Sequence, residues 1–386
     1  MTTAGHCWPT SAQQLLLRAA LVPGPETLAA WQRSAPEASL DTLDAGSIRL
    51  LPLLYRSLER LGVHDPVMGR LKGVYRHAWY GNQLRLRDAA PVLAELRGRG
   101  IAAMLLKGAA LTLGYYRDVG LRPMDDVDVL VRADQARPAA DALHALGWRP
   151  AVPVTARRVG ASHAVEFADA RGQRIDLHWH LSPDACWPGI DDAFWGRARA
   201  TALHGVGVAV LDPTDQLFHT CAHGVRWEPV SPVRWVADAA VILREASADI
   251  DWDRLVGLAE RLRLVLPARD ALAYLARTLG LAVPPGVLDA LRGAAVSRTE
   301  RWEYRMRTRP SSPVLGRLPE HWLRYRRLRR ARGSADRITF VAYLEIALDC
   351  QGVGALVHRA VFRHRWRQGA ERGARARERL DRVQLP

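Results

Sequence analysis

The amino-acid sequence predicts an α+β fold in which a small mixed sheet lies between two helical regions of the chain. Three observations lead to this prediction. Residues 1–98 carry apolar side chains at helical spacing, and residues 99–211 change to short apolar or alternating runs. Helical spacing returns from residue 212 onward. The middle region reads as strand, helix, strand, helix, strand, strand, an order typical of a mixed α/β sheet.

The helices are predicted from apolar periodicity and from the Pro and Gly residues that interrupt it. Outside the middle region, the predicted helices are 11–21, 46–62, 67–98, 213–225, 232–246, 251–264 and 268–280, and within it an amphipathic helix is predicted over 133–147. Changes in apolar spacing and in Arg content then divide the chain into an N-terminal helical region, an α/β core, a second helical domain and an Arg-rich helical C-terminal region. Their predicted bounds are 1–98, 99–211, 212–298 and 299–386.

The middle region begins with the apolar run 101–106, which fits a buried strand. The segment MDDVDVLVR alternates, so that three valines face one way while Asp126 and Asp128 face the other. Residues 161–181 are typical of a hairpin that turns at Arg171-Gly172. Residues 200–211 are predicted as one further strand.

Composition places limits on the class of protein. The 386 residues are 48% hydrophobic and 25% charged, which is typical of a soluble globular chain with a sizeable core. No apolar run reaches the roughly 18 residues of a spanning helix, and the first residues do not resemble a signal peptide. We therefore expect a cytoplasmic protein without a membrane span. The four cysteines are scattered, which favours reduced thiols over disulfides or a zinc site.

The net charge of +15 is concentrated at one end of the chain. Residues 300–386 hold 21 Arg against 9 Asp or Glu, so 21 − 9 = +12 of the total lies there. This region is either a solvated helical surface or a basic surface for nucleic acid, anionic lipid or an acidic partner. Lysine is rare, with Lys72 and Lys107 against 53 Arg, which indicates that a retained lysine is needed for its compact ammonium group.

Carboxylates at the head of the alternating strand are the main candidates for chemistry. Asp126 and Asp128 would project from one face, where their repulsion favours a bound cation. Paired hard oxygen donors suit Mg²⁺. Asp176 begins another strand-like run, and a neighbouring strand could bring it to the same edge. Three carboxylates form the minimum layout for two-metal phosphoryl or nucleotidyl transfer, whereas a lone pair of acids at a strand end is common without metal.

Basic and imidazole groups surround this constellation. Lys107 and Gly108 follow a strand and open a helix, a position where free backbone N–H groups and a glycine favour phosphate binding. Arg122 is predicted as a further phosphate clamp. His178 shares a strand face with Asp176 and either contacts the nucleotide or acceptor or is packed. A helical pair, His219 and His223, has the spacing of zinc ligands, with helix packing as the alternative.

The motifs LLKGAAL, YY, RPMDDVDVLV and IDLHW, spread over roughly residues 75–245, resemble a bacterial family usually called uncharacterised nucleotidyltransferases. This family belongs to the polymerase-beta-like superfamily. The resemblance implies the minimal nucleotidyltransferase fold, with Asp126 and Asp128 as metal ligands, Asp176 as the third carboxylate and Gly108 in the phosphate loop. The superfamily usually has Gly-Ser after the first strand, whereas this chain has Gly108-Ala109 preceded by Lys107.

The resemblance also implies a reaction. A nucleoside monophosphate would pass from an NTP, expected to be ATP, to an unidentified acceptor with Mg²⁺ or Mn²⁺ and release of pyrophosphate. The acceptor could be a small molecule, a peptide, a protein or RNA. Two alternatives stay open: a kinase-like transferase that attacks the terminal phosphate, and a non-catalytic nucleic-acid or partner-binding protein that uses the Arg-rich C-terminal region.

Overall fold

The computed structural model describes residues 7–22, 24–34, 40, 43–228, 230–310, 317–332, 338–350, 352 and 354–355. The chain divides into two units, which are described separately. The first unit comprises Met1–Val159 with His163–Pro310, and the second comprises Gly160–Ser162 with Ser311–Pro386. The four-part division expected from the sequence remains a prediction, and the Arg-rich residues 359–386 lie outside the described residues.

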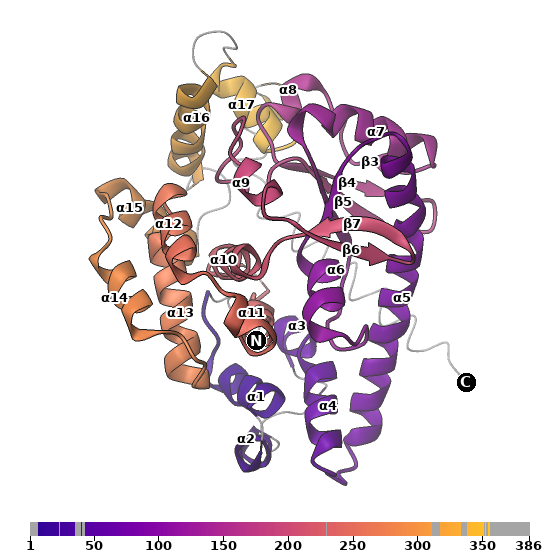
Figure 1. The fold of residues 1–386 in the computed structure, drawn as a ribbon, viewed down its shortest axis with the longest axis vertical. Helices are drawn as coiled ribbons and strands as arrows, with labels where there is room; N and C mark the ends of the chain where they lie inside the picture. The colour runs from indigo at the N-terminus through magenta and orange to yellow at the C-terminus, as the bar shows by residue number, and fades with distance from the viewer. Residues whose placement is uncertain are drawn as a thin grey trace. The chain divides into compact units, whose positions relative to one another are not determined.

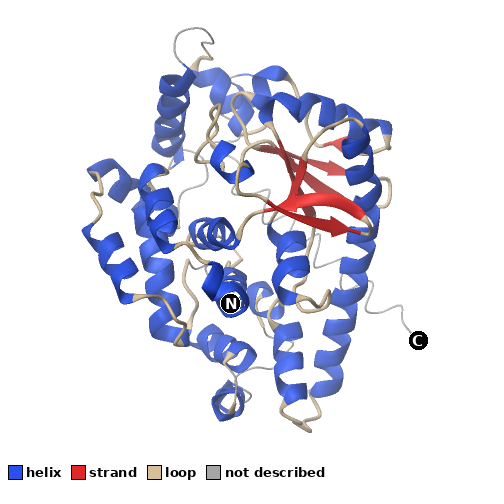
Figure 2. Cartoon of the chain, in the orientation of Figure 1, coloured by secondary structure: helices blue, strands red, loops and turns tan. Residues whose placement is uncertain are grey.

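The centre of the first unit is a mixed seven-stranded sheet (Figures 1 and 2), in the order β3-β4-β5-β2-β1-β7-β6. Strands β2 and β5 pair in parallel, as do β1 and β7, and the other neighbours are antiparallel. The strands are β1 Ala103–Leu105, β2 Val127–Val131, β3 Arg149–Pro150, β4 Ala164–Ala168, β5 Arg174–His178, β6 Arg199–Leu203 and β7 Val206–Val210. The α+β class predicted from the sequence is confirmed.

The single strand predicted over residues 200–211 is wrong. This segment folds into the hairpin β6–β7, which turns at His204 and Gly205 with φ angles of 47° and 80°. Two consecutive residues with positive φ make the tight turn that matches the twist of paired strands. The two-residue edge strand β3 is a further element that the sequence pattern did not predict.

The described residues before residue 99 are mostly helical. Its helices are α1 Ser11–Leu21, α2 Pro25–Ser34, α3 Ala45–Ile48, α4 Leu51–Arg60 and α5 Met68–Gly98. Thr10 begins α1 with a capping box, because its hydroxyl accepts from the N–H of Gln13 while the Gln13 side chain accepts from the N–H of Thr10. The helix predicted over 46–62 is divided into α3 and α4, and Pro52 lies in the first turn of α4, where proline is favoured.

Helices cover both faces of the sheet. Apolar side chains of α5 and of α7 Ala136–Ala145 pack on one face, against the odd-numbered valines of β2. On the opposite face, Met104 and Leu130 join an apolar core with α1, α4 and the helices that follow β7. These later helices are α10 Pro213–Gly224, α11 Arg234–Ala246, α12 Trp252–Arg261, α13 Val265–Leu279, α14 Pro285–Gly293 and α15 Arg298–Thr308. Residues Asp128 and Asp176 alternate onto this second face.

Short elements complete the first unit. They are α6 Lys107–Leu111, the π-helix η1 Thr112–Tyr116, the 3₁₀ helices η2 Ala133–Gln135 and η3 Ser247–Asp249, α8 Ala156–Val159 and α9 Asp192–Trp195. The π-helix directly follows the predicted phosphate loop, and such single π-turns frequently mark functional sites.

The second unit contains α16 Leu318–Arg332 and α17 Phe340–Ala347. The two helices pack through an aromatic cluster in which Trp322 and Phe340 have ring centroids 5.0 Å apart. Tyr325 joins the same cluster and donates its hydroxyl to the carbonyl of Ile338 at 3.1 Å. Among the described residues of both units, every helix is too short or too polar to cross a membrane.

Candidate functional site

Strand register brings the predicted carboxylates together. In the parallel pair β2–β5, Asp128 lies directly opposite Asp176, and His178 lies two residues further along the same face of β5. One donor atom from each of these three residues lies within 4.8 Å of the other two. The carboxylate and imidazole groups that the sequence indicated separately therefore form one cluster on the second face of the sheet.

Asp128 is almost completely enclosed, with 3% of its surface exposed. Its Oδ1 lies 2.5 Å from Lys107 Nζ and 3.1 Å from His178 Nε2. Although burial opposes ionisation of this carboxyl, Lys107 and His178 hold its pKa well below the usual range. Asp128 is therefore a carboxylate at any ordinary pH.

Asp126 differs from Asp128 in its surroundings. It lies one residue before β2, is half-buried, and stands outside the three-residue cluster of closely spaced donor atoms. Burial raises the pKa of Asp126 to about 6, with further increases from the negative charges of Asp128 and Asp176. Lys107 and Arg174 partly offset this rise. Asp126 thus borders the cluster, and the negative charges of the cluster oppose its ionisation.

The loop that joins β1 to α6 places Lys107 beside Asp128. The N–H of Leu106 donates to the carbonyl of Asp128 at 3.0 Å, which fixes the loop to β2 through the backbone. Lys107 itself adopts a φ of 40°, a left-handed conformation that is uncommon for a residue with a side chain. Such backbone strain persists only where the surrounding structure enforces it, and it concentrates at functional sites.

Gly108 permits the close packing beneath this loop. A Cβ atom at this position would lie 2.7 Å from Arg122 Nη1 and 2.7 Å from the side chain of Met124. Both neighbours are buried, so neither can withdraw into solvent. The glycine predicted for a phosphate loop is thus required here by its contact with the RPM segment.

Arg122 does not face solvent. Only 5% of its surface is exposed, and its guanidinium donates two hydrogen bonds to Asp238 of α11, at 2.8 and 2.9 Å. The hydroxyl of Tyr116 donates to the same carboxylate at 2.8 Å. The geometry therefore gives Arg122 a supporting position under Gly108 rather than the open position of the phosphate clamp expected from the sequence.

Arg174, unlike Arg122, is a basic side chain that is open to solvent beside the cluster. It lies at the first residue of β5, with 43% of its side chain exposed, and its charge lowers the pKa of Asp126. Its contacts to Glu166 at 3.3 Å and to the carbonyl of Asp125 at 3.5 Å are long. Sequence reasoning passed over Arg174, although its position two residues before Asp176 on the same strand face was a usable signal.

Other residues that the sequence did not single out fix the loop before β2. Asn82 of α5 is buried and donates to the carbonyls of Val119 and Arg122, while its Oδ1 accepts from the N–H of Met124. Arg234 of α11 donates to the carbonyl of Pro123 at 2.8 Å. A polar side chain on the apolar stripe of α5 was a signal that could have identified Asn82.

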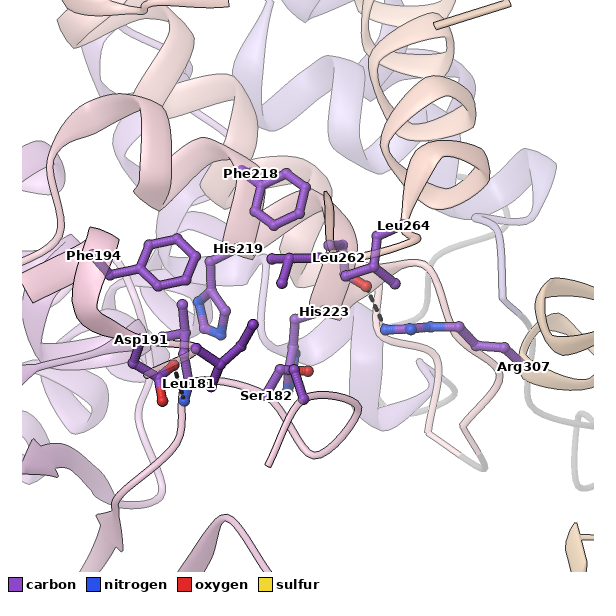
Figure 3. A pocket seen from close by; sticks show the side chains of 13 residues that line it. Leu181, Ser182, Asp191, Phe194, Phe218, His219, His223, Leu262, Leu264 and Arg307 are labelled. Atoms are coloured by element: carbon purple, nitrogen blue, oxygen red, sulfur yellow. Dashed lines mark hydrogen bonds between the residues drawn. The ribbon is translucent and has the colours of Figure 1, made fainter. Parts of the chain in front are cut away.

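Helix α10 supplies the wall that faces the cluster. Burial, together with the charges of Lys107 and His178, lowers the pKa of His219 to about 3, so its imidazole is neutral. His219 and His223 have ring centroids 5.5 Å apart and line a cavity of about 30 Å³, which is room for a water molecule rather than a substrate (Figure 3). Within the described residues, the metal-ligand cluster does not include this pair, which favours packing over zinc.

The chemistry of the cluster fits a divalent metal ion. Asp128 and Asp176 supply hard oxygen donors of the kind that Mg²⁺ and Mn²⁺ accept, and His178 adds a nitrogen donor that suits Mn²⁺. The buried Nδ1 of His178 has no hydrogen-bond partner among the described residues. Three closely spaced donors with one unsatisfied ring nitrogen are consistent with a site that is completed by a ligand.

A mixed sheet that presents paired carboxylates behind a glycine loop is the arrangement of the nucleotidyltransferase class of enzymes. Residues 45–280, which are more than half of the chain, match the family described as "Uncharacterised nucleotidyltransferase". The chain belongs to this family. The resemblance seen in the sequence motifs is thereby confirmed, and the protein is a transferase. No curated protein matches the sequence.

Solved structures that match part of this chain include the antibiotic-resistance factor ANT(2'')-Ia in solution, at 15% identity and a TM-score of 0.33, covering 47% of this chain and 92% of that chain. The crystal structure of ANT(2'')-Ia with adenylyl-2''-tobramycin shares 14% identity over 47% and 97% of the two chains, with a TM-score of 0.33. An antigenic nucleotidyltransferase-like protein from Paracoccidioides brasiliensis shares 14% identity over 56% and 95%, with a TM-score of 0.34. Similarities of this size carry no conclusion about substrates.

Proposed function

We propose that this nucleotidyltransferase transfers a nucleoside monophosphate from an NTP to a hydroxyl-bearing acceptor and releases pyrophosphate. The convergence of Asp128 and Asp176 on neighbouring strands, with Asp126 at the border, is the observation that carries the proposal. In the reaction, an acceptor oxygen bonds to the α-phosphorus while the bond from that phosphorus to the β-phosphate bridging oxygen breaks. Pyrophosphate leaves, and the hydroxyl proton passes to the surrounding water.

Three carboxylates would hold the metal ions. Asp126 and Asp128 would bind the metal that accompanies the nucleotide, and Asp176 would bind the second one. When bound, Mg²⁺ or Mn²⁺ supplies a Lewis acid that neutralises phosphate oxygens and lowers the pKa of the acceptor hydroxyl. His178 lies 3.1 Å from Asp128 Oδ1, so it would orient that carboxylate and offer a further donor toward the metal or the nucleotide.

Positive groups of the chain would neutralise the phosphates. Lys107 places a compact ammonium at the mouth of the Gly108 loop, where a planar guanidinium would find less room. Arg174 brings a half-exposed guanidinium to the opposite border, near Asp126. Arg122 would act as a positioning residue, because its ion pair with Asp238 lies under Gly108 and holds the loop in place.

Reaction products separate this proposal from a kinase-like reaction on the same residues. We would incubate the full chain with Mg²⁺ or Mn²⁺, a cell extract, and each NTP labelled at either the α- or the γ-phosphate. The proposal expects α-label in the acceptor and γ-label in pyrophosphate, with ATP as the preferred donor. Transfer of γ-label to the acceptor with formation of ADP would establish the kinase-like alternative instead.

The proposal extends to the acceptor and to the location of the protein. The acceptor is a small molecule, a peptide, a protein or RNA, and the reaction takes place in the cytoplasm. A contact with nucleic acid through the Arg-rich region 299–386 is likewise a proposal from charge. Membership of a nucleotidyltransferase family favours an enzyme over the non-catalytic binding protein that the sequence left open.

A further inference from the structure

Lys107 occupies the position beside Asp128 where a cation is expected. Its ammonium lies 2.5 Å from Asp128 Oδ1, the same oxygen that His178 Nε2 approaches at 3.1 Å. The carboxylate is almost completely buried, whereas 26% of the lysine side chain is exposed. One oxygen of a buried candidate metal ligand is thus already neutralised by a residue of the chain itself.

Backbone and packing contacts on both sides of Lys107 hold this ion pair in place. The backbone N–H of Leu106 is bonded to the carbonyl of Asp128, so the residue before the lysine is fixed to the residue it pairs with. Lys107 has a φ of 40°, and Gly108 behind it is packed against Arg122 and Met124. The strained backbone of Lys107 and the contacts on both sides of it show that the fold enforces the position of this lysine.

An ammonium and a divalent ion cannot share this carboxylate at close range, because two positive charges in a partly desolvated site repel strongly. Lys107 is partly exposed and has a long flexible stem, so it is the partner that can leave. Asp128 is enclosed on its strand and must stay. A group that takes the ammonium away, such as a phosphate, would therefore open the carboxylate to a metal ion.

We propose that Lys107 is an exchangeable counter-ion that keeps Asp128 closed to free metal ions until nucleotide phosphates draw its ammonium away. This inference rests on the proposed function and adds a binding order to it: metal and nucleotide enter together rather than metal first. The device would prevent the cluster from binding divalent ions that arrive without nucleotide. Linkage then requires that metal also strengthens nucleotide binding by the same factor.

The direct test measures Mn²⁺ binding to the full chain with and without α,β-methylene-ATP. The electron paramagnetic resonance signal of free Mn²⁺ monitors the binding. We expect the wild-type protein to bind Mn²⁺ weakly alone and at least about tenfold more tightly with the analogue, within the usual range of coupling between sites. Lys107→Met should bind Mn²⁺ about tenfold more tightly without the analogue, because the competing charge is gone. Lys72→Met, which replaces the exposed lysine of α5, is the matched control and should resemble the wild type.

A second measurement follows the lysine ammonium groups of the wild-type protein directly. The chain has two lysines, so ¹⁵N-lysine labelling gives two side-chain ammonium signals that the two variants assign. The Lys107 signal should shift when Mg²⁺ and α,β-methylene-ATP are added together and should change little with equimolar Mg²⁺ alone. An unchanged or weaker Mn²⁺ affinity in Lys107→Met, with a Lys107 signal indifferent to the analogue, would overturn the inference while leaving the proposed function intact. Absence of Mn²⁺ binding under every condition would overturn both.

Discussion

Asp238 of α11 accepts two hydrogen bonds from the guanidinium of Arg122, at 2.8 and 2.9 Å, and joins a helix to a loop 116 residues earlier in the chain. Both side chains are buried, and Tyr116 donates a further hydrogen bond to the same carboxylate. Because Arg122 Nη1 packs closely against Gly108, this ion pair connects helix α11 to the proposed phosphate loop.

Asp238→Asn is expected to lower the free energy of unfolding by about 3 to 5 kcal/mol, because it leaves a buried guanidinium without its counter-charge. Urea unfolding measures the change. Glu245→Gln provides a matched control, since Glu245 of the same helix pairs with Arg117 in an exposed ion pair at 3.7 Å. That control should lose less than about 1 kcal/mol. Equal losses in the two variants would show that the buried pair has no special role.

Asp126→Asn should stabilise the metal-free protein, and the gain should depend on pH. The folded-state pKa of Asp126 is about 6, above its unfolded value of 3.8, so its ionisation opposes folding. The protonated Asp126 carboxyl contributes its full share to the stability of the wild-type protein below about pH 4, and this contribution is lost as the pH rises through 6. The difference in unfolding free energy between variant and wild type should therefore grow by about 2 to 3 kcal/mol from pH 4 to pH 7.

Thermal or urea unfolding across this pH range, in EDTA, checks the prediction. Saturating Mg²⁺ should shrink the difference, because a bound cation stabilises the ionised carboxylate. A difference that is constant with pH would contradict the assignment of the raised pKa to Asp126. The stabilisation should not extend to Asp128→Asn, because that change leaves Lys107 without its partner.

Arg174→Ala is expected to raise the KM for the NTP several-fold while changing kcat less, because the side chain would contact phosphate in both the bound and reacting states. The effect should weaken at high salt, as expected for a half-exposed charge. Arg171→Ala serves as the control, since Arg171 lies at the turn of the same hairpin and pairs with Asp169 and Asp88. If steady-state kinetics give both variants the same KM for the NTP, Arg174 does not contact the phosphates of the nucleotide.

Deletion of residues 359–386, which lie outside the described residues, should leave the KM for the NTP unchanged. This segment carries nine Arg against three acids, so it would act through sequence-independent attraction. With a small neutral acceptor, we expect unaltered kinetics. With a polyanionic acceptor, the acceptor KM should rise, and more so at low salt, because fewer counterions are released on binding. Complete loss of turnover in a folded truncated chain would contradict this account and assign the tail to the active site.

The sequence predicted the local features of the site well. Alternation along β2 separated Asp126 and Asp128 from the valines, and the hairpin pattern identified the strand of Asp176. These features depend on residues close in the chain, where a two-residue period is visible. The turn at His204 and Gly205 was equally local, and it was missed because a histidine with positive φ is uncommon.

Non-local pairing limited what the sequence could predict. The register that sets Asp128 opposite Asp176 depends on which strands pair, and the pattern does not fix this. Arg122 was expected to face a phosphate because its charge and loop position favour that role, yet the side chain is neutralised by Asp238 from a distant helix. The sequence likewise placed Lys107 near the acidic strand without indicating that its ammonium pairs with Asp128.

The carboxylates of β2 and β5 are proposed to act on the nucleotide. The most direct measurement compares transfer of label from the α-phosphate of the preferred NTP by wild type, Asp128→Asn, Asp176→Asn and Glu166→Gln. Glu166 of β4 lies opposite Asp176 on the same sheet face and pairs with Arg174, so it is a matched carboxylate outside the cluster. We predict that both aspartate variants remain folded and lose roughly a thousandfold in rate, whereas Glu166→Gln stays within about threefold of wild type. A wild-type rate in Asp128→Asn or Asp176→Asn would contradict the account.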